Sequence, residues 1–185
     1  MGPVVWPLNV SVNVPPAILG ARTALGGPTM GGMLAELELE PYLDRLVCEI
    51  TERQALSAQG RAALEIARQN RIRLAVDDVG TGHSGVAQIL GLTIDVLKLD
   101  RSQVVLLTRD VSAERLVRGI IVLASMIRAR VVAEGVETAA QAFFLQAAGV
   151  DYGQGWFWSR ALPAAELPKV LEAGAPISLE VDVPV

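Results

Sequence analysis

Short runs of β-branched and aliphatic residues alternate with longer amphipathic segments along the chain from Leu46 onward. The short runs predict buried strands, at residues 46–50, 72–76, 94–99 and 130–133. The longer segments predict helices, at residues 61–69, 84–90 and 116–127 and from Thr138 to Gly149. Strands that alternate with helices at this spacing form parallel βαβ units. The pattern therefore predicts an α/β fold.

Signals at the predicted helix ends support these assignments. Thr138 and Gln141 have the spacing of a capping box, and Gly149 follows the last apolar residues of that helix. Asn70 is suited to a left-handed C-cap after residues 61–69. The expected core face of the helix at 116–127 carries Leu116, Ile120, Leu123 and Ile127.

Composition narrows the class of protein. The chain has 185 residues, 51% of them hydrophobic, which suits a single domain spanning residues 1–185 with its own core. Its 16 Lys and Arg against 20 Asp and Glu give a net charge of −4, which argues against a DNA or RNA partner that requires a broad basic face. The single cysteine, Cys48, excludes an intramolecular disulfide and is interpreted as a small buried hydrophobe. The longest nearly apolar run, 119–127, is too short to span a membrane, so the expected location is the cytoplasm.

Polar residues recur where the predicted strands end. This set comprises Asn13, Glu49, Glu52, Asp77, Asp78, Lys98, Asp100, Glu134 and Glu137. Ligands of parallel α/β folds bind at the carboxyl ends of the strands. Each such acid alone is often only a helix cap. A set of converging carboxylates, however, requires a neutralising cation, and hard oxygen ligands favour Mg²⁺ or Mn²⁺ over zinc.

Five segments resemble, in order, the motifs of the EAL-domain cyclic-di-GMP phosphodiesterases. They are Glu49-Ile50-Thr51-Glu52, Asp77-Asp78-Val79-Gly80-Thr81-Gly82, Val96-Leu97-Lys98-Leu99-Asp100, Ala133-Glu134-Gly135-Val136-Glu137-Thr138 and Asp151-Tyr152-Gly153-Gln154-Gly155. The resemblance covers about residues 9–167. It implies a TIM-type (β/α) barrel with one antiparallel strand, incomplete here because about six of the usual eight strands are present. It also implies two-metal hydrolysis of cyclic-di-GMP to linear pGpG, with Mg²⁺ or Mn²⁺ as the cofactor.

The resemblance implies three groups of site residues. The implied ligands of the two metal ions are Asn13, Glu49, Asp77, Asp78 and Glu134. The implied catalytic residues, which contact or position water and substrate, are Lys98, Glu134, Glu137 and Gln154. The residues implied to stabilise the loop after the paired aspartates are Glu52, Thr81 and Gly82.

The sequence departs from the family pattern before Asn13, where the Glu-Ala-Leu motif with its metal-binding Glu is not found. Val79 and His83 also replace a usual Phe and a common Tyr. The first metal site is therefore expected to be under-coordinated. Three functions remain open: a phosphodiesterase that acts alone or when a partner chain completes the barrel, a catalytically impaired cyclic-di-GMP sensor, and a protein-interaction module without nucleotide binding. The resemblance implies a homodimer near the loop at 77–84.

Two further segments carry open interpretations. Four aromatic residues cluster at Tyr152, Trp156, Phe157 and Trp158, and we interpret them as anchors of a core strand in preference to stacking partners for guanine. The segment 177–185 alternates apolar and polar residues, within an additional tail at 174–185. It predicts a strand that covers a barrel edge or pairs with a second chain, so its deletion is expected to cause aggregation or change the oligomeric state.

Overall fold

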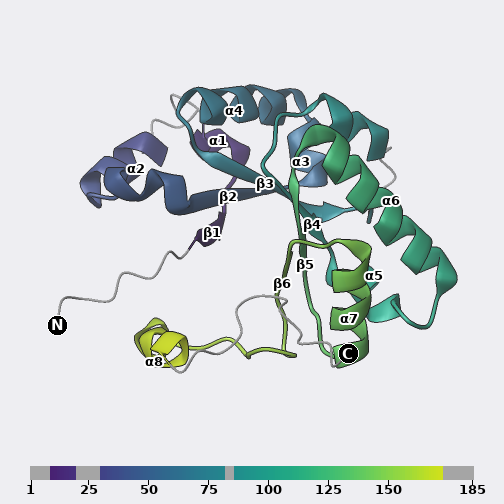
Figure 1. Ribbon diagram of the computed structural model, residues 1–185. Coiled ribbons are helices and arrows are strands. Elements are labelled where there is room, and N and C mark those ends of the chain that lie inside the picture. Colours follow the sequence, from purple (N-terminus) through teal and green to yellow (C-terminus); the bar gives the residue numbers. More distant parts are fainter. Residues whose placement is uncertain (1–8, 20–29, 82–85, 173–185) are drawn as a thin grey trace. The chain divides into compact units, whose positions relative to one another are not determined.

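Six strands occur in the residues that the computed structural model describes, which are 9–19, 30–81 and 86–172 (Figure 1). These strands are β1 (Val10–Asn13), β2 (Leu46–Thr51), β3 (Arg73–Val79), β4 (Val96–Leu99), β5 (Arg130–Ala133) and β6 (Tyr152–Gly153). The chain forms two compact units, Met1–Val96 and Leu97–Val185, and each is described by itself. The pairs β1–β2, β2–β3 and β5–β6 are all parallel, so the predicted α/β class is confirmed. The antiparallel strand implied by the resemblance is not among these three pairs.

In the first unit, β2 lies between β1 and β3 and is buried over its central residues (Figure 1). The helices of this unit are α1 (Pro16–Leu19), α2 (Met30–Glu36), α3 (Glu52–Leu56) and α4 (Ala58–Gln69), with 3₁₀ helices at Glu40–Arg45 and Val86–Gly91. The helix predicted at 84–90 is therefore a 3₁₀ helix over its described part. The core of the first unit consists of aliphatic side chains from β2, β3 and α4, and Cys48 within this core is fully buried, as predicted.

A capping box begins α3. Thr51 Oγ1 accepts a hydrogen bond from the Gln54 backbone N–H (3.3 Å), and Gln54 Oε1 accepts one from the Thr51 N–H (3.0 Å). Ser57 then begins α4 by accepting from the Gly60 N–H (2.9 Å). A Cβ on Gly60 would lie 1.8 Å from the Gln54 carbonyl oxygen, so only glycine permits this tight junction between the two helices.

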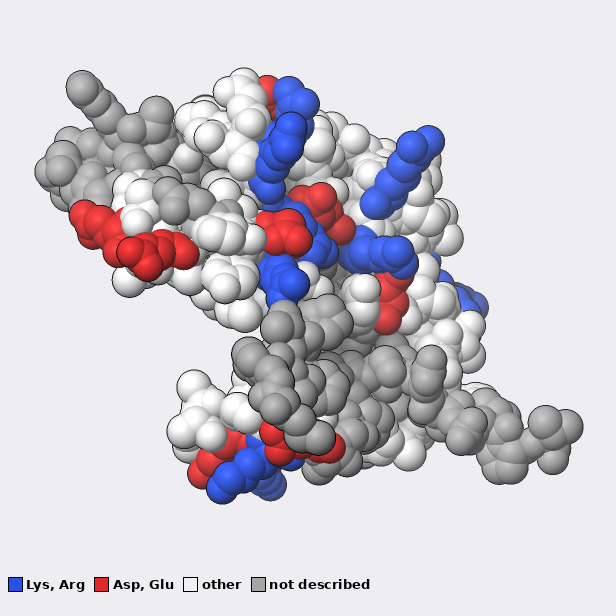
Figure 2. Space-filling view, turned by 60° about the vertical axis from the view of Figure 1, so that its left-hand side comes forward, with Lys and Arg blue, Asp and Glu red and all other residues white. Residues whose placement is uncertain are grey.

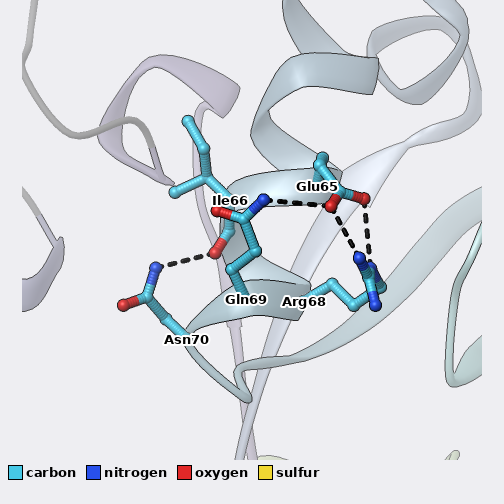
Figure 3. Close-up of polar contacts among 5 residues, drawn as sticks. All are labelled: Glu65, Ile66, Arg68, Gln69 and Asn70. Carbon is cyan, nitrogen blue, oxygen red and sulfur yellow. Dashed lines mark hydrogen bonds and ion pairs between the residues drawn. The ribbon is translucent and has the colours of Figure 1, made fainter.

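The end of α4 corrects the prediction for Asn70, which has φ −92° and is not left-handed. Its side-chain amide instead donates to the Ile66 carbonyl (2.7 Å), as Figure 3 shows. The left-handed residue is Arg71 (φ 59°), and the N–H of Ile72 then reaches back to the Ala67 carbonyl (2.9 Å). This is a Schellman ending with arginine at the position that favours glycine.

The last turn of α4 also carries a surface network (Figure 3). The Glu65 carboxylate accepts from Arg68 Nη2 (2.7 Å) and from Gln69 Nε2 (3.0 Å). The hydrogen bond from Arg68 lowers the pKa of Glu65 and, reciprocally, raises the pKa of Arg68. Because these groups are exposed, we attribute little stability to the pair.

The second unit contains β5 and β6 in parallel, with Ala133 opposite Gly153. Its helices are α5 (Arg101–Leu106), α6 (Val111–Ile127), α7 (Ala139–Ala148) and α8 (Leu167–Glu172), with a 3₁₀ helix at Ala164–Glu166. The capping box of α7 at Thr138 and Gln141 and its end at the left-handed Gly149 (φ 91°) are both confirmed.

The core face of α6 agrees with the prediction at Ile120 and Leu123 but differs at Leu116. Leu116 is 39% exposed, whereas Val117 is fully buried and Ile120 is 1% exposed. The buried residues of the helix are Ala113, Val117, Ile120, Leu123 and Ala124. The helix begins at Val111 after the N-cap Asp110, which lies N-terminal to the predicted start, and small alanines complete the buried stripe.

Among its described residues, the face drawn in Figure 2 has no broad patch of side chains of one charge. In Figure 2, Lys and Arg side chains are interspersed with Asp and Glu side chains, with uncharged surface between them. Within the described ranges, no helix has the length and apolar character that crossing a bilayer requires.

Candidate active site

In the first unit, polar side chains gather at the carboxyl end of the parallel strands. Asn13 of β1 is the register partner of Glu49 of β2, and Glu49 is the partner of Ala75 in β3. Because side chains alternate along a strand, Asp77 lies on the same face as Ala75, and therefore on the face of Asn13 and Glu49. Glu49 is 5% exposed, while Asn13 is exposed. Three of the predicted metal ligands thus share one face and one end of this sheet.

Left-handed backbone occurs at the end of β3 and in the turn that follows it. Asp78 has φ 59° and Gly80 has φ 84°. The Asp78 N–H donates to Asp77 Oδ1 (2.9 Å), and Thr81 Oγ1 donates to the Asp78 carbonyl (2.8 Å). Neighbouring residues therefore hold both aspartates at the strand end.

Glu52 connects the first turn of α3 to this loop. Its Oε2 accepts a hydrogen bond from the Gly80 N–H at 3.0 Å, and its side chain is 4% exposed. The bond from Thr81 Oγ1 to the Asp78 carbonyl and the bond from the Gly80 N–H to Glu52 restrain the same short turn. Gly82, which the resemblance places with Glu52 and Thr81, lies outside the described residues, as does His83.

In the second unit, three side chains from consecutive strand ends converge. Lys98 of β4 forms an ion pair with Glu134, which follows β5. Gln154, which follows β6, donates from Nε2 to the same Glu134 oxygen (2.9 Å). The Lys98 side chain is only 6% exposed, so its ammonium is largely removed from water. The structure thus brings together three of the four predicted catalytic residues.

The fourth, Glu137, lies in the same segment as Glu134 but has a different partner. Glu137 Oε1 accepts from Arg101 Nη2 at 2.6 Å. The Glu137 N–H donates to Gln141 Oε1 (2.9 Å), which joins this segment to the capping box of α7. Sequence reasoning missed Arg101, although its place directly after Asp100 at the end of β4 was the available signal.

The donor chemistry of these residues fits a hard divalent cation. Asn13, Glu49 and Asp77 offer only oxygen ligands, which suit Mg²⁺ or Mn²⁺. Within the described parts of the two units, no cluster of three or more Asp, Glu, His or Cys side chains is close enough to form a ligand set. Cys48 does not supply a thiolate ligand to the described site, because it is buried in the core and burial raises its pKa to about 11.

The prediction that the aromatic cluster forms a core strand is wrong for three of its four members. Tyr152 is 48% exposed, Trp156 56% and Phe157 38%. Strand β6 ends at Gly153, so the following aromatics lie in a turn beyond the sheet. The guanidinium carbons of Arg101 and Arg160 lie 5.7 Å and 4.3 Å from the centroid of the Trp156 ring, which is cation–π range.

The predicted tail strand at 177–185 lies outside the described residues, so its edge-covering role stays a prediction.

The sequence model of the EAL domain matches residues 7–161, which include the strand-end residues of both units. This chain belongs to the EAL domain family. The match confirms the resemblance carried by the five motifs.

Relatives of this EAL chain agree in sequence and in fold. The "Probable cyclic di-GMP phosphodiesterase PdeD" of Escherichia coli is 38% identical over 135 residues, 72% of this chain and 25% of that protein. The crystal structure of the EAL domain of Mycobacterium smegmatis DcpA is 30% identical with a TM-score of 0.76, over 90% of this chain and 74% of that one. A manganese and cyclic-di-GMP complex of Klebsiella pneumoniae BlrP1 is 28% identical with a TM-score of 0.70, over 82% of this chain and 38% of that one.

These likenesses establish the fold class of the EAL chain. It is α/β, an incomplete TIM-type (β/α) barrel with six strands among the described residues, where a complete barrel has eight. The chain spans about a quarter of the length of PdeD.

Proposed function

We propose that residues 1–185 act as one EAL-type domain that hydrolyses cyclic-di-GMP to pGpG. The observation that carries this proposal is the convergence of Lys98, Glu134 and Gln154 from three consecutive strand ends. The Lys98 side chain is only 6% exposed, and an ammonium so far removed from water is costly to build, so a fold maintained only for its core has no need of it. The oxygen donors at the carboxyl ends of β1, β2 and β3 support the same reaction class.

We assign the metal ligands as the resemblance implies, to Asn13, Glu49, Asp77, Asp78 and Glu134, with the first of the two sites under-coordinated. Bound Mg²⁺ or Mn²⁺ supplies Lewis acidity and lowers the pKa of a coordinated water. The manganese and cyclic-di-GMP complex of BlrP1 supports a divalent cation here.

The chain's own residues have separate tasks in this proposal. Lys98 places a positive charge where negative charge accumulates on the phosphodiester. Gln154 orients the Glu134 carboxylate by donating to it. Glu52 and Thr81, through Gly80 and Asp78, hold the turn at the end of β3, next to both aspartates. Glu137 is assigned to positioning water, as the resemblance implies.

The test is product formation. The purified chain is incubated with cyclic-di-GMP and Mn²⁺, and pGpG is followed by chromatography. We expect product that disappears in Asp77→Ala and persists in Asp44→Ala, an exposed aspartate of the same unit. No product from the unaltered chain would refute the proposal. Calorimetry with cyclic-di-GMP would then separate the sensor, which binds, from the interaction module, which does not.

An apolar groove on β1 favours the variant in which further polypeptide completes the barrel. The groove has a volume of about 450 Å³ and is lined by Val10, Val12, Leu34, Leu39, Tyr42, Arg45 and Leu46. Parallel strands are normally covered on both faces, yet Val10 is 56% exposed. The occupant that we propose is the quarter of an EAL domain for which the match to DcpA leaves no counterpart in this chain.

Fusing that unmatched part of the DcpA domain ahead of Asn9 tests this completion. We expect the fusion to bind less of the apolar dye ANS and to form pGpG faster than the chain alone. Light scattering on the unfused chain reports the alternative, a homodimer through the same groove. Equal dye binding by the two proteins would contradict completion at this site.

A further inference from the structure

Arg101 makes three contacts with two segments of the second unit that carry candidate active-site residues. It is the first residue of α5, directly after the end of β4 and the N-cap Asp100. We propose that Arg101 is a positioning residue that holds the segment Glu134–Glu137 in its place for catalysis. This inference rests on the proposed function, and it assigns Arg101 a task that the five motifs do not.

The aliphatic stem of Arg101 lies against the backbone of Gly135. Gly135 has φ 66°, and a Cβ on it would lie 2.3 Å from Arg101 Cγ. A side chain at this position would therefore push Arg101 away, so the close approach requires glycine both for its conformation and for its lack of a Cβ. The stem restrains the backbone directly after Glu134.

The guanidinium of Arg101 restrains the other end of the same segment. Nη2 lies 2.6 Å from Glu137 Oε1, while the Arg101 side chain is 58% exposed and that of Glu137 is 34% exposed. An exposed ion pair of this kind contributes little stability by itself. Its effect here is geometric, because stem and head group of one side chain contact residues 135 and 137 together.

The third contact joins this segment to the turn after β6. The Arg101 guanidinium faces the Trp156 ring at 5.7 Å. The Val136 N–H donates to the Gln154 carbonyl (3.1 Å), and a Cβ on Gly155 would lie 2.2 Å from the Val136 carbonyl oxygen. The segment Glu134–Glu137 and the turn after β6 are therefore closely packed and hydrogen-bonded to each other, and Arg101 contacts both.

The consequence concerns the cluster of Lys98, Glu134 and Gln154. Glu134 and Gln154 belong to the two segments that Arg101 contacts, and Lys98 belongs to the strand that precedes it. Removing the Arg101 contacts leaves these three residues unaltered but loosens the backbone that sets their relative positions. Misplacement of reacting groups by about 1 Å can cost on the order of a hundredfold in rate.

Three variants test the proposal. Arg101→Met keeps the stem but removes the guanidinium, and Arg101→Lys keeps the stem and the charge. Arg118→Met is the matched control. The Arg118 guanidinium of α6 also lies over an aromatic ring, that of Phe144 in α7, at 4.8 Å from its centroid. For each variant we measure kcat and KM for cyclic-di-GMP with Mn²⁺, thermal unfolding, and hydrogen exchange of the Val136 and Glu137 amides without metal or nucleotide.

We expect Arg101→Met to lower kcat about tenfold or more with KM changed less than about twofold, because positioning acts on the reacting groups. Arg101→Lys should recover most of this loss, and Arg118→Met should resemble the unaltered chain. The Val136 and Glu137 amides should exchange about tenfold faster in Arg101→Met, which reports local opening. Equal loss in Arg101→Lys and Arg101→Met, or kcat equal to that of Arg118→Met, would overturn the proposal.

The exchange measurement separates failure of this inference from failure of the proposed function. If the unaltered chain forms no pGpG, the proposed function fails, and exchange at Val136 and Glu137 alone decides whether Arg101 positions the segment. If exchange is unchanged in Arg101→Met, the positioning role is refuted whatever the activity.

Discussion

The hydrogen bond from Gly80 to Glu52 allows a quantitative prediction about the turn that follows Asp77 and Asp78 at the end of β3. Glu52→Ala removes the oxygen that accepts from the Gly80 N–H at 3.0 Å. A hydrogen bond to a charged group contributes about 1.5–3 kcal/mol, and a donor left without its acceptor adds a desolvation cost. Glu52 is also 4% exposed in the first turn of α3, where its charge is favoured by the helix dipole.

One term opposes this loss. Among the described residues, Glu52 Oε1 is buried without a hydrogen-bond partner, so removing the carboxylate also removes a desolvation cost. We therefore expect Glu52→Ala to lower the free energy of unfolding by about 2 kcal/mol. Glu52→Gln keeps a carbonyl oxygen that can accept from Gly80 and loses only the charge, so it should cost less than about 1 kcal/mol.

Urea unfolding followed by circular dichroism measures these differences, and a loss of about 2 kcal/mol corresponds to a fall in Tm of about 4–8 °C for a chain of this size. Arg53→Ala, at the exposed neighbouring position of α3, is the control. The Gly80 amide should also exchange faster in Glu52→Ala than in Glu52→Gln. If Glu52→Ala unfolds at the same urea concentration as Arg53→Ala, the reasoning is refuted.

Three further predictions follow from local features. Gly149 has open space around its Cβ position but a left-handed backbone (φ 91°), so Gly149→Ala should cost about 1 kcal/mol through backbone strain alone. Arg128→Gly relieves a left-handed arginine (φ 60°) and should stabilise the chain by about 0.5 kcal/mol. Free energies of urea unfolding that change in the same direction for both variants would contradict this. Burial raises the pKa of Cys48 to about 11, so a thiol reagent at pH 8 should label Cys48 only after unfolding, and rapid labelling of the folded chain would refute its burial. The stability that the buried thiol contributes should be present below the pKa of the unfolded thiol and decline as the pH rises towards 11. Thr138→Ala should lower the free energy of unfolding by about 1 kcal/mol through loss of the α7 capping box, and unchanged unfolding would show that the cap is dispensable.

Local signals were readable where the physics is local. A capping box needs only two residues three apart, so Thr138 and Gln141 identified the start of α7 from sequence. The same signature at Thr51 and Gln54 begins α3, but that helix is only five residues long and has no apolar period from which a helix could be predicted. An asparagine at a helix end can adopt the left-handed conformation or donate from its side chain to a helix carbonyl. Asn70 donates to the Ile66 carbonyl and keeps a negative φ.

Packing decided the features that span longer distances. The buried stripe of α6 depends on where that helix lies on its neighbours, so Val117 is buried and Leu116 is exposed although both are apolar. The exposure of Trp156 depends on where β6 ends, and an aromatic residue suits either a core or a surface turn.

The sequence by itself determined the family, the α/β class and the identity of the candidate residues, because motifs at strand ends are fixed by chain order and by the chemistry that each residue type provides. Only the tertiary structure decided which of these residues meet. It paired Lys98 and Gln154 with Glu134, and it gave Glu137 to Arg101, a residue outside every motif role assigned from the sequence. The physical reason is that hydrogen bonds and ion pairs depend on distances of about 3 Å, which are set by strand register and loop conformation and are not encoded in residue spacing.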